Sequence, residues 1–332
     1  MKLSILDQSS ISKGKSAKEA LEASKELAKA AEKLGYTRYW MAEHHNFSGL
    51  TCSAPEVMLG YIGAHTQTIR IGAGAVLLPH YKPYRVAETY NMLATLFPNR
   101  IDLGIGRAPG GSAEATMALS DNFLKNVRQM PQSVKELLQF LQNGFPSDHM
   151  FSKIAPSPVP DISPVPWVLG TSQKSALLAA EYGTAYAFGH FMSDKPGPEI
   201  VAAYQDRFQA SKMQKRPETI IAVSVICAET TEEAEELALP GLLWRLQIAK
   251  GEGGNGVPVL GEAQHHFSKE EQKEMIEKAK RKMIIGNPCE VAEELKQLQK
   301  LYQADEMMIV TITNRYEDRA QSYKLLADQI HS

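Results

Sequence analysis

Short apolar runs alternate along the chain with longer segments in which apolar residues recur every three or four positions. Eight of the short runs are predicted as strands, because they are rich in β-branched and other apolar residues. They cover residues 3–7, 37–42, 69–77, 100–107, 167–170, 185–189, 220–228 and 306–313. Each run is followed by a helix-like segment. The first of these, residues 16–35, ends at Gly35, a typical helix stop.

Strands that alternate with helices predict a parallel sheet. Closure into a (β/α)8 TIM barrel accounts for the strand number, the length and the absence of a second composition zone, so one domain over residues 1–332 is expected. An open doubly wound sheet is the alternative. Two excursions interrupt the alternation. One follows strand four and includes the proline-rich residues 145–166, and the other follows strand seven and contains GEGGNGVP and a Lys/Glu-rich helix. Asn287, Pro288 and Glu290 then predict a capping box.

Composition narrows the class of protein without identifying a function. The chain has 332 residues, 43% hydrophobic and 22% charged, which is typical of a globular protein. A net charge of −2 gives no sign of binding to nucleic acid or acidic membranes. The sequence has neither a signal-peptide core nor an apolar stretch long enough to span a bilayer. Cys52, Cys227 and Cys289 are far apart, so free thiols in a reducing cytoplasm are expected.

Glu43, His44 and His45 follow directly after the second predicted strand. Adjacent residues of an extended segment point to opposite faces, so the two histidines are poorly placed to share a metal ion. A single imidazole at the barrel mouth suits proton transfer or hydrogen bonding, because its ordinary pKa lies near neutrality. A polar strand end without chemistry is the alternative.

Small residues end the third and fourth predicted strands. Gly74 and Ala75 allow a flat group to approach the backbone or allow unusual dihedral angles, although close packing of the next helix explains them equally well. Arg107 follows Gly104 and Gly106 at the end of strand four. A cation on an accessible glycine-rich turn suits a phosphate or carboxylate, and a structural salt bridge is the alternative.

The loop after strand five has the character of an anion site. Gly170, Thr171, Ser172 and Ser175 place amides and hydroxyls at a predicted helix N-terminus, where unpaired N–H groups and the helix dipole favour a phosphate. The alternative is that Thr171 or Ser172 only caps the helix. Together with Arg107 on the neighbouring strand, the phosphate interpretation is favoured.

These clusters resemble those of a known family. The matching stretches are AEHH, GAGAVLLPHYKPYRVAE, FPNRIDLGIGRAPGG and LGTSQKSALLAAEYG, which occur in the same order over nearly the whole chain. They resemble the bacterial luciferase-like flavin monooxygenases, and most closely the single-chain oxidoreductases of that family. The resemblance implies a TIM barrel that binds reduced FMN at its C-terminal mouth, with the deazaflavin F420 as the less favoured cofactor. It also implies a homodimer.

The resemblance assigns roles to individual residues. His44 matches a histidine for acid/base work beside the flavin, and Arg107 matches an arginine on the FMN phosphate. Residues 171–175 match a loop on the same phosphate, and Gly74–Ala75 falls where the family has a cis peptide bond that is not followed by proline. Two departures exist. Gly106 replaces a cysteine, and Lys174 stands where a hydroxyl residue is expected, so light emission and long-chain aldehydes are not expected.

The implied reaction is a monooxygenation of a small organic substrate through a flavin C4a-peroxide, with O2 as co-substrate. Reduced FMN would come from a separate NAD(P)H:flavin reductase, and His45 or Glu43 would orient His44. The glycines of the strand-seven excursion are a predicted lid, and residues 145–166 and 240–285 are predicted to set specificity. A non-catalytic FMN-binding barrel and a metal-dependent hydrolase are the remaining alternatives, although the histidine spacing does not suit a metal.

Overall fold

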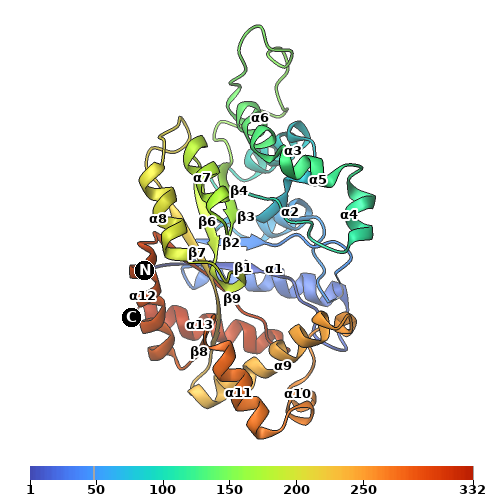
Figure 1. Ribbon diagram of the computed structural model, residues 1–332, viewed down its shortest axis with the longest axis vertical. Coiled ribbons are helices and arrows are strands. Elements are labelled where there is room, and N and C mark those ends of the chain that lie inside the picture. Colours follow the sequence, from blue (N-terminus) through green and yellow to red (C-terminus); the bar gives the residue numbers. More distant parts are fainter. Residues whose placement is uncertain (48, 332) are drawn as a thin grey trace.

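The computed structural model describes residues 1–47 and 49–331 and has a closed parallel barrel at its centre (Figure 1). Strands β1 to β7 pair in sequence order, and β9 closes the ring between β7 and β1. The barrel strands are β1 (Lys2–Asp7), β2 (Arg38–Met41), β3 (Arg70–Leu77), β4 (Ile101–Gly106), β5 (Val165–Gly170), β6 (Ala185–Gly189), β7 (Thr219–Cys227) and β9 (Glu306–Val310). The predicted eight-stranded barrel is therefore confirmed, and the open sheet is excluded.

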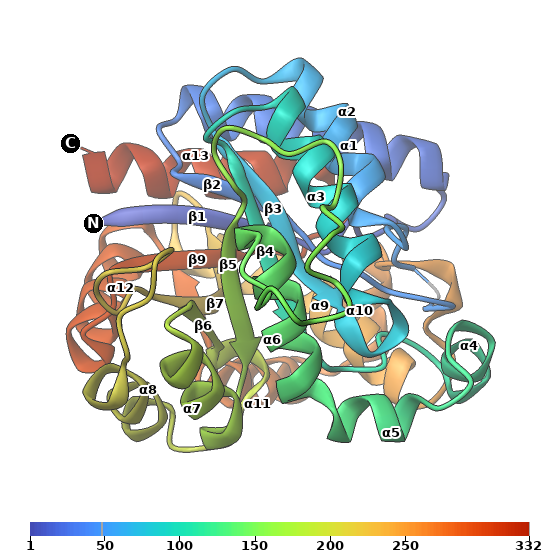
Figure 2. The same cartoon turned by 90° about the horizontal axis from the view of Figure 1, so that it is seen from above.

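Helices surround the barrel, and both views place the two chain ends on the same side (Figures 1 and 2). Serine, threonine and asparagine caps begin several of them, and the capping box predicted at Asn287 is confirmed. The helices are α1 (Ala17–Lys33), α2 (Pro55–His65), α3 (Pro83–Leu96), α4 (Ala113–Leu119), α5 (Phe123–Arg128), α6 (Met130–Gln142), α7 (Gln173–Tyr182), α8 (Gly197–Arg207), α9 (Thr231–Ala249), α10 (Leu260–His266), α11 (Lys269–Ala279), α12 (Pro288–Tyr302) and α13 (Tyr316–His331), with 3₁₀ turns η1 (Leu78–His80), η2 (His190–Met192) and η3 (Gly253–Asn255). Among the described helices, none is long and apolar enough to cross a bilayer.

A ninth strand, β8 (Met283–Gly286), was not predicted from the sequence. It pairs with the second half of β7, from Ser224 to Cys227, outside the closed ring. β7 is nine residues long, and its first half pairs with β6. The four-residue run of β8 is too short for periodicity to distinguish a strand from a buried helix end.

The barrel interior is filled near its lower end. Trp40 and Trp167 meet edge to face with ring centroids 5.5 Å apart, and both are buried. Below them, Arg38 donates to Glu306 at 2.8 Å and to Asp102 at 2.9 Å. All three ionic residues lie at the N-terminal ends of strands, so this network closes the bottom of the barrel and leaves the C-terminal mouth for a ligand.

The two excursions lie where they were predicted, after β4 and after β7. The first carries α4 to α6 and occupies the upper part of Figure 1, and the second carries α9 to α11 in the lower part. The glycine-rich loop of the second excursion is held in place: the amide of Val257 donates to Ile11 O, and that of Lys13 donates to Val257 O, both at 2.8 Å.

Candidate active site

A cavity of about 460 Å³ opens at the C-terminal mouth of the barrel. Its lining is mostly apolar, with Leu6, Trp40, Ala222 and Met308 contributed by the strands. Seven of the eight predicted site residues line it, namely His44, Gly74, Ala75, Arg107, Gly170, Thr171 and Ser172. The eighth, Ser175, lies directly behind, with its Oγ 3.3 Å from that of Ser172. The barrel thus brings together residues that are distant in the sequence.

Arg107 leaves the end of β4 as an exposed cation. Over residues 1–47 and 49–331, the Arg107 guanidinium has neither a carboxylate nor a hydrogen-bond partner. Its charge acts on Tyr186: burial raises the pKa of this phenol to about 12, and Arg107 opposes the shift. The Tyr186 hydroxyl donates to Gly170 O at 3.2 Å. Arg107 therefore lies close to the β5 loop.

The N-terminus of α7 forms the second part of the anion site. Ser172 is the N-cap, and its hydroxyl accepts from the Ser175 amide at 3.3 Å, so the capping alternative is true for this hydroxyl. The amides of Gln173 and Lys174 begin the helix and have no intrahelical acceptor. The exposed Lys174 adds a second cation there. An anion between Arg107 and α7 would meet two cations and the positive end of a helix dipole.

Backbone without bulky side chains forms the wall between the β3 and β4 ends. The Gly74–Ala75 peptide bond is cis, as the resemblance implied, and β3 shifts its register against β4 here. A Cβ added to Gly74 would lie 2.6 Å from Leu6 Cδ1, and one added to Gly106 would lie 3.0 Å from Ala75 Cβ. Glycine at these positions keeps the wall flat enough for a planar ring.

Glu43 is bound to His45 and not to His44. Its Oε1 lies 2.8 Å from His45 Nε2 and accepts from the Tyr81 hydroxyl at 2.7 Å. Its Oε2 accepts from the Leu77 amide at 3.2 Å. Neither Glu43 nor His45 forms a hydrogen bond with His44, so the structure gives no support to the expectation that one of them orients it. The alternation along the extended chain separates the two imidazoles, and only His44 lines the cavity.

His44 is an uncharged imidazole at neutral pH. Burial, with a smaller contribution from the charge of His45, lowers the pKa of His44 to about 4. The His44 Nδ1 is buried without a hydrogen-bond partner in the described part of the chain. Protonation at Nδ1 would leave a buried N–H group without an acceptor, which is consistent with the lowered pKa. The residue is suited to accept a proton from a ligand and to remain neutral until it does.

Comparison with known proteins places this barrel in a family. The luciferase-like monooxygenase family matches the chain over residues 1–304. The chain belongs to the luciferase-like monooxygenase family. The uncharacterized protein YwcH of Bacillus subtilis (strain 168) is 43% identical over 98% of each chain. The N-acetyl-S-alkylcysteine monooxygenase of the same organism is 36% identical over 99% of this chain and 98% of its own.

Solved structures agree with this family membership. The apo-MsnO8 crystal structure has a TM-score of 0.88 and 30% identity, and covers 99% of this chain and 98% of its own. Two more distant structures show the shared fold. One is the oxygenating constituent of 3,6-diketocamphane monooxygenase from Pseudomonas putida with FMN (TM-score 0.72, 18% identity, 99% of this chain and 98% of its own). The other is an F420-dependent secondary alcohol dehydrogenase with an F420-acetone adduct (0.70, 15%, 100% and 99%). Proteins of this luciferase-like fold thus bind either FMN or F420.

Sequence reasoning missed the apolar rim of the cavity in this family member. The rim consists of Phe123, Leu124 and Val127 on α5 and Phe191 and Met192 on η2. By contrast, among the described residues of 145–166 and 240–285, none lines the cavity, and neither does the glycine loop predicted as a lid. The sequence signal for this rim was a cluster of three apolar residues within five positions, Phe123, Leu124 and Val127. The structure shows no buried residue in α5, so they face the cavity or solvent.

The α5 rim is held over the mouth by contacts with η1. The Phe123 ring stacks on the His80 ring with centroids 4.9 Å apart, and the side-chain amide of Asn126 donates to Pro79 O at 2.9 Å. Leu124 is 72% exposed although it lines the cavity, so this side chain lies at its open edge. α5 therefore forms the apolar rim of the cavity together with η2.

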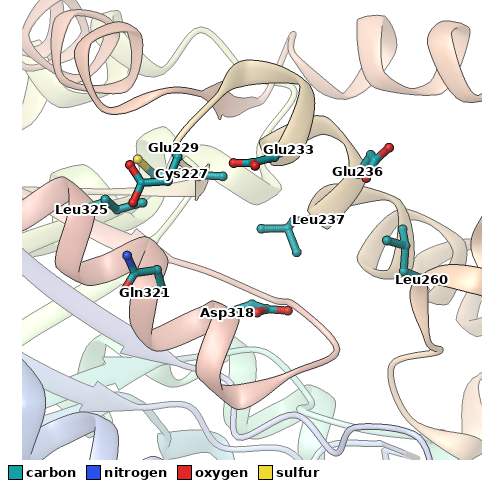
Figure 3. Close-up of a pocket in the computed structure, with 10 residues that line it drawn as sticks. Cys227, Glu229, Glu233, Glu236, Leu237, Leu260, Asp318, Gln321 and Leu325 are labelled. Carbon is teal, nitrogen blue, oxygen red and sulfur yellow. The ribbon is translucent and has the colours of Figure 1, made fainter.

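A second hollow lies between α9 and α13 and does not fit a phosphate (Figure 3). It measures about 250 Å³ and has Cys227 at its base. Its rim carries Glu229, Glu233, Glu236 and Asp318, and its lining includes no cation in the described part of the chain. Four carboxylates would repel an anionic cofactor, so the barrel mouth is the better candidate site.

Proposed function

We propose that this protein is an FMN-dependent monooxygenase that receives reduced FMN from a separate NAD(P)H:flavin reductase and oxygenates a small organic substrate with O2. The observation that carries the proposal is the unpaired Arg107 guanidinium, which shares one cavity with the α7 N-terminus and the neutral His44. When bound, reduced flavin supplies two electrons, so that one oxygen atom enters the product and the other leaves as water.

The residues around the cavity would hold and enclose the cofactor. Arg107 and the first amides of α7 would bind the phosphate, with Lys174 as a further cation. Two cations suit the dianionic monoester of FMN better than the singly charged diester of F420. The flat wall at Gly74 and Ala75 would lie against the ring system, and the mostly apolar lining would exclude water. His44 would accept a proton from the substrate or return it.

The relatives narrow the substrates worth testing. An S-alkyl thioether is the first choice, because the N-acetyl-S-alkylcysteine monooxygenase is 36% identical over nearly its whole length. Such a reaction adds one oxygen atom at sulfur, which gives a sulfoxide, or at the adjacent carbon, which gives a hemithioacetal that breaks down to a thiol and an aldehyde. The sulfoxide and the breakdown products differ in mass. Small aldehydes and alkanes complete the panel.

Anaerobic titration with reduced FMN and with reduced riboflavin tests the proposal. Riboflavin lacks the phosphate, so Arg107→Gln is expected to weaken FMN binding about ten- to a hundredfold and leave riboflavin binding unchanged. Arg107→Lys, which keeps the charge, is expected to retain part of the preference for FMN. Equal affinity of the wild type for the two flavins would refute the phosphate site. FMN binding without any substrate-dependent product would favour the non-catalytic alternative.

A further inference from the structure

Gln8 is the one carboxamide among the described residues that line the barrel-mouth cavity, and the proposed flavin site does not use it. It directly follows β1, and Leu6 of that strand lines the same cavity. The side chain of Gln8 is half-buried and forms no hydrogen bond over residues 1–47 and 49–331. Its carbonyl oxygen and its two N–H groups are therefore available to a ligand.

The residues on either side of Gln8 fix its backbone. Asp7 is buried on the outer side of the barrel wall, where its carboxylate lies 2.9 Å from the guanidinium of Arg319 on α13. The Ser9 amide donates to Asp7 Oδ1 at 2.8 Å, and the Ser9 hydroxyl lies 2.7 Å from that of Thr51. Because adjacent residues of an extended chain point to opposite faces, the outward Asp7 directs Gln8 into the cavity.

The order of the strands places Gln8 across the mouth from the anion site. β1 lies four strands from β5 in either direction around the closed barrel. A phosphate between Arg107 and α7, with a ring system against Gly74 and Ala75, would occupy the side formed by β3, β4 and β5. The opposite side of the cavity, which carries Gln8, is then left for the substrate.

This substrate side carries His44 and has no free charge. The register of β1 against β2 places Gln8 beside Ala42, two residues before His44. Glu43 is the one carboxylate among the described lining residues, and both of its oxygens already accept hydrogen bonds. A charged group would therefore meet no free counter-charge here, which favours a neutral ligand. The other lining residues from β1, β2, β7 and β9 are apolar, namely Leu6, Trp40, Ala42, Ala222 and Met308.

We propose that Gln8 selects substrates with a neutral primary carboxamide, which would exchange two hydrogen bonds with the Gln8 side chain. A primary carboxamide has a carbonyl acceptor and an N–H donor side by side, and Gln8 presents the complementary pair. An ester has no donor, and a carboxylate would bring an uncompensated charge. The apolar part of the substrate would lie against Leu6 and Met308, with its reacting atom near His44. This inference rests on the proposed monooxygenase function, since only that function makes the ligand a substrate.

Calorimetric titration with hexanamide, methyl hexanoate and hexanoate tests the inference, because these probes share one apolar chain and differ in the polar group. The titrations use the full chain with and without saturating FMN. The wild type is expected to bind hexanamide at least tenfold more tightly than the ester or the acid. Gln8→Met keeps the length of the side chain and removes its amide. It is expected to weaken hexanamide binding about tenfold and to leave the ester and FMN affinities unchanged. Gln132→Met, at an exposed glutamine of α6 outside the cavity, is the matched control and should bind all three probes like the wild type.

Three outcomes would overturn the inference. The first is that hexanamide does not bind, or binds no better than the ester. The second is that Gln8→Met keeps the preference for hexanamide. The third is that Gln8→Met weakens FMN binding and that saturating FMN abolishes the preference in the wild type, which would assign Gln8 to the flavin ring. The proposed function fails separately: if FMN does not bind but the preference for hexanamide still depends on Gln8, the flavin proposal is refuted and the carboxamide site stands.

Discussion

The protonation of His44 couples the candidate active site to the stability of the fold. Burial and the charge of His45 lower the pKa of this imidazole to about 4 in the folded chain. In the unfolded chain the pKa returns to about 6.5. Between these two values the unfolded state binds more protons, so the free energy of unfolding rises with pH. The stability associated with neutral His44 is therefore complete above pH 6.5 and is lost as the pH falls toward 4.

The size of this effect follows from the shift. A depression of about 2.5 units corresponds to about 3 kcal/mol, at about 1.4 kcal/mol per unit. Replacement of His44 by glutamine removes the titrating group and keeps a polar side chain of similar size. The free energy of unfolding of the wild type, relative to that of His44→Gln, should therefore fall by about 3 kcal/mol between pH 7.5 and pH 4. This difference should be constant above pH 7.

Urea unfolding of both proteins across this pH range measures the difference directly. Every other titrating group is common to the two proteins, so the difference isolates His44 as long as unfolding is two-state. The proton resonances of the His44 ring give an independent pKa. A stability difference that does not change with pH, together with a ring that titrates near pH 6.5, would refute the account of His44 as a buried neutral base.

The remaining predictions concern the barrel floor, the rim and the anion site. Arg38→Met leaves the buried Glu306 carboxylate without its cation and removes one of the two cations that contact Asp102, the other being Arg70. It is expected to lower the free energy of unfolding by about 3–5 kcal/mol, against less than about 1 kcal/mol for Arg216→Met at an exposed ion pair, both by urea unfolding. Phe123→Ala opens the rim and should lower the product formed per reduced FMN while hydrogen peroxide rises. Gly170→Ala places a Cβ 2.3 Å from Ser175 Oγ and should weaken FMN binding about tenfold, whereas Gly60→Ala, with open space around it, should leave the affinity unchanged in a fluorescence titration.

Much of the candidate site could be predicted because barrel topology is a strong constraint. Once the strands are known to be parallel and closed, residues just after them must converge at one mouth, whatever their separation in sequence. That rule places His44, Gly74, Arg107 and Thr171 around one cavity, and all four line it. The alternation of side chains along an extended segment also separates His44 from His45. Both arguments use only backbone geometry.

The parts that could not be predicted depend on how side chains and short segments pack. The three apolar residues of α5 were only a weak signal that this helix, and not residues 145–166, would line the cavity, because α5 is only six residues long. β8 is too short to be recognised from its pattern. The hydrogen bonds of Glu43 could not be predicted either, because two of its donors, the Tyr81 hydroxyl and the Leu77 amide, come from the end of another strand.

Arginines illustrate this limit most clearly. Arg38 and Arg107 are both cations near apolar elements, and the sequence alone does not show which of them is paired. The folded chain separates them by their partners. Arg38 is paired with two carboxylates at the barrel floor, whereas Arg107 lacks a carboxylate partner in the described residues and lines the cavity at the mouth. Because an unpaired cation gains most from an anionic ligand, the pairing of each guanidinium, and not its place in the sequence, distinguishes the arginine that holds the barrel together from the one available for binding.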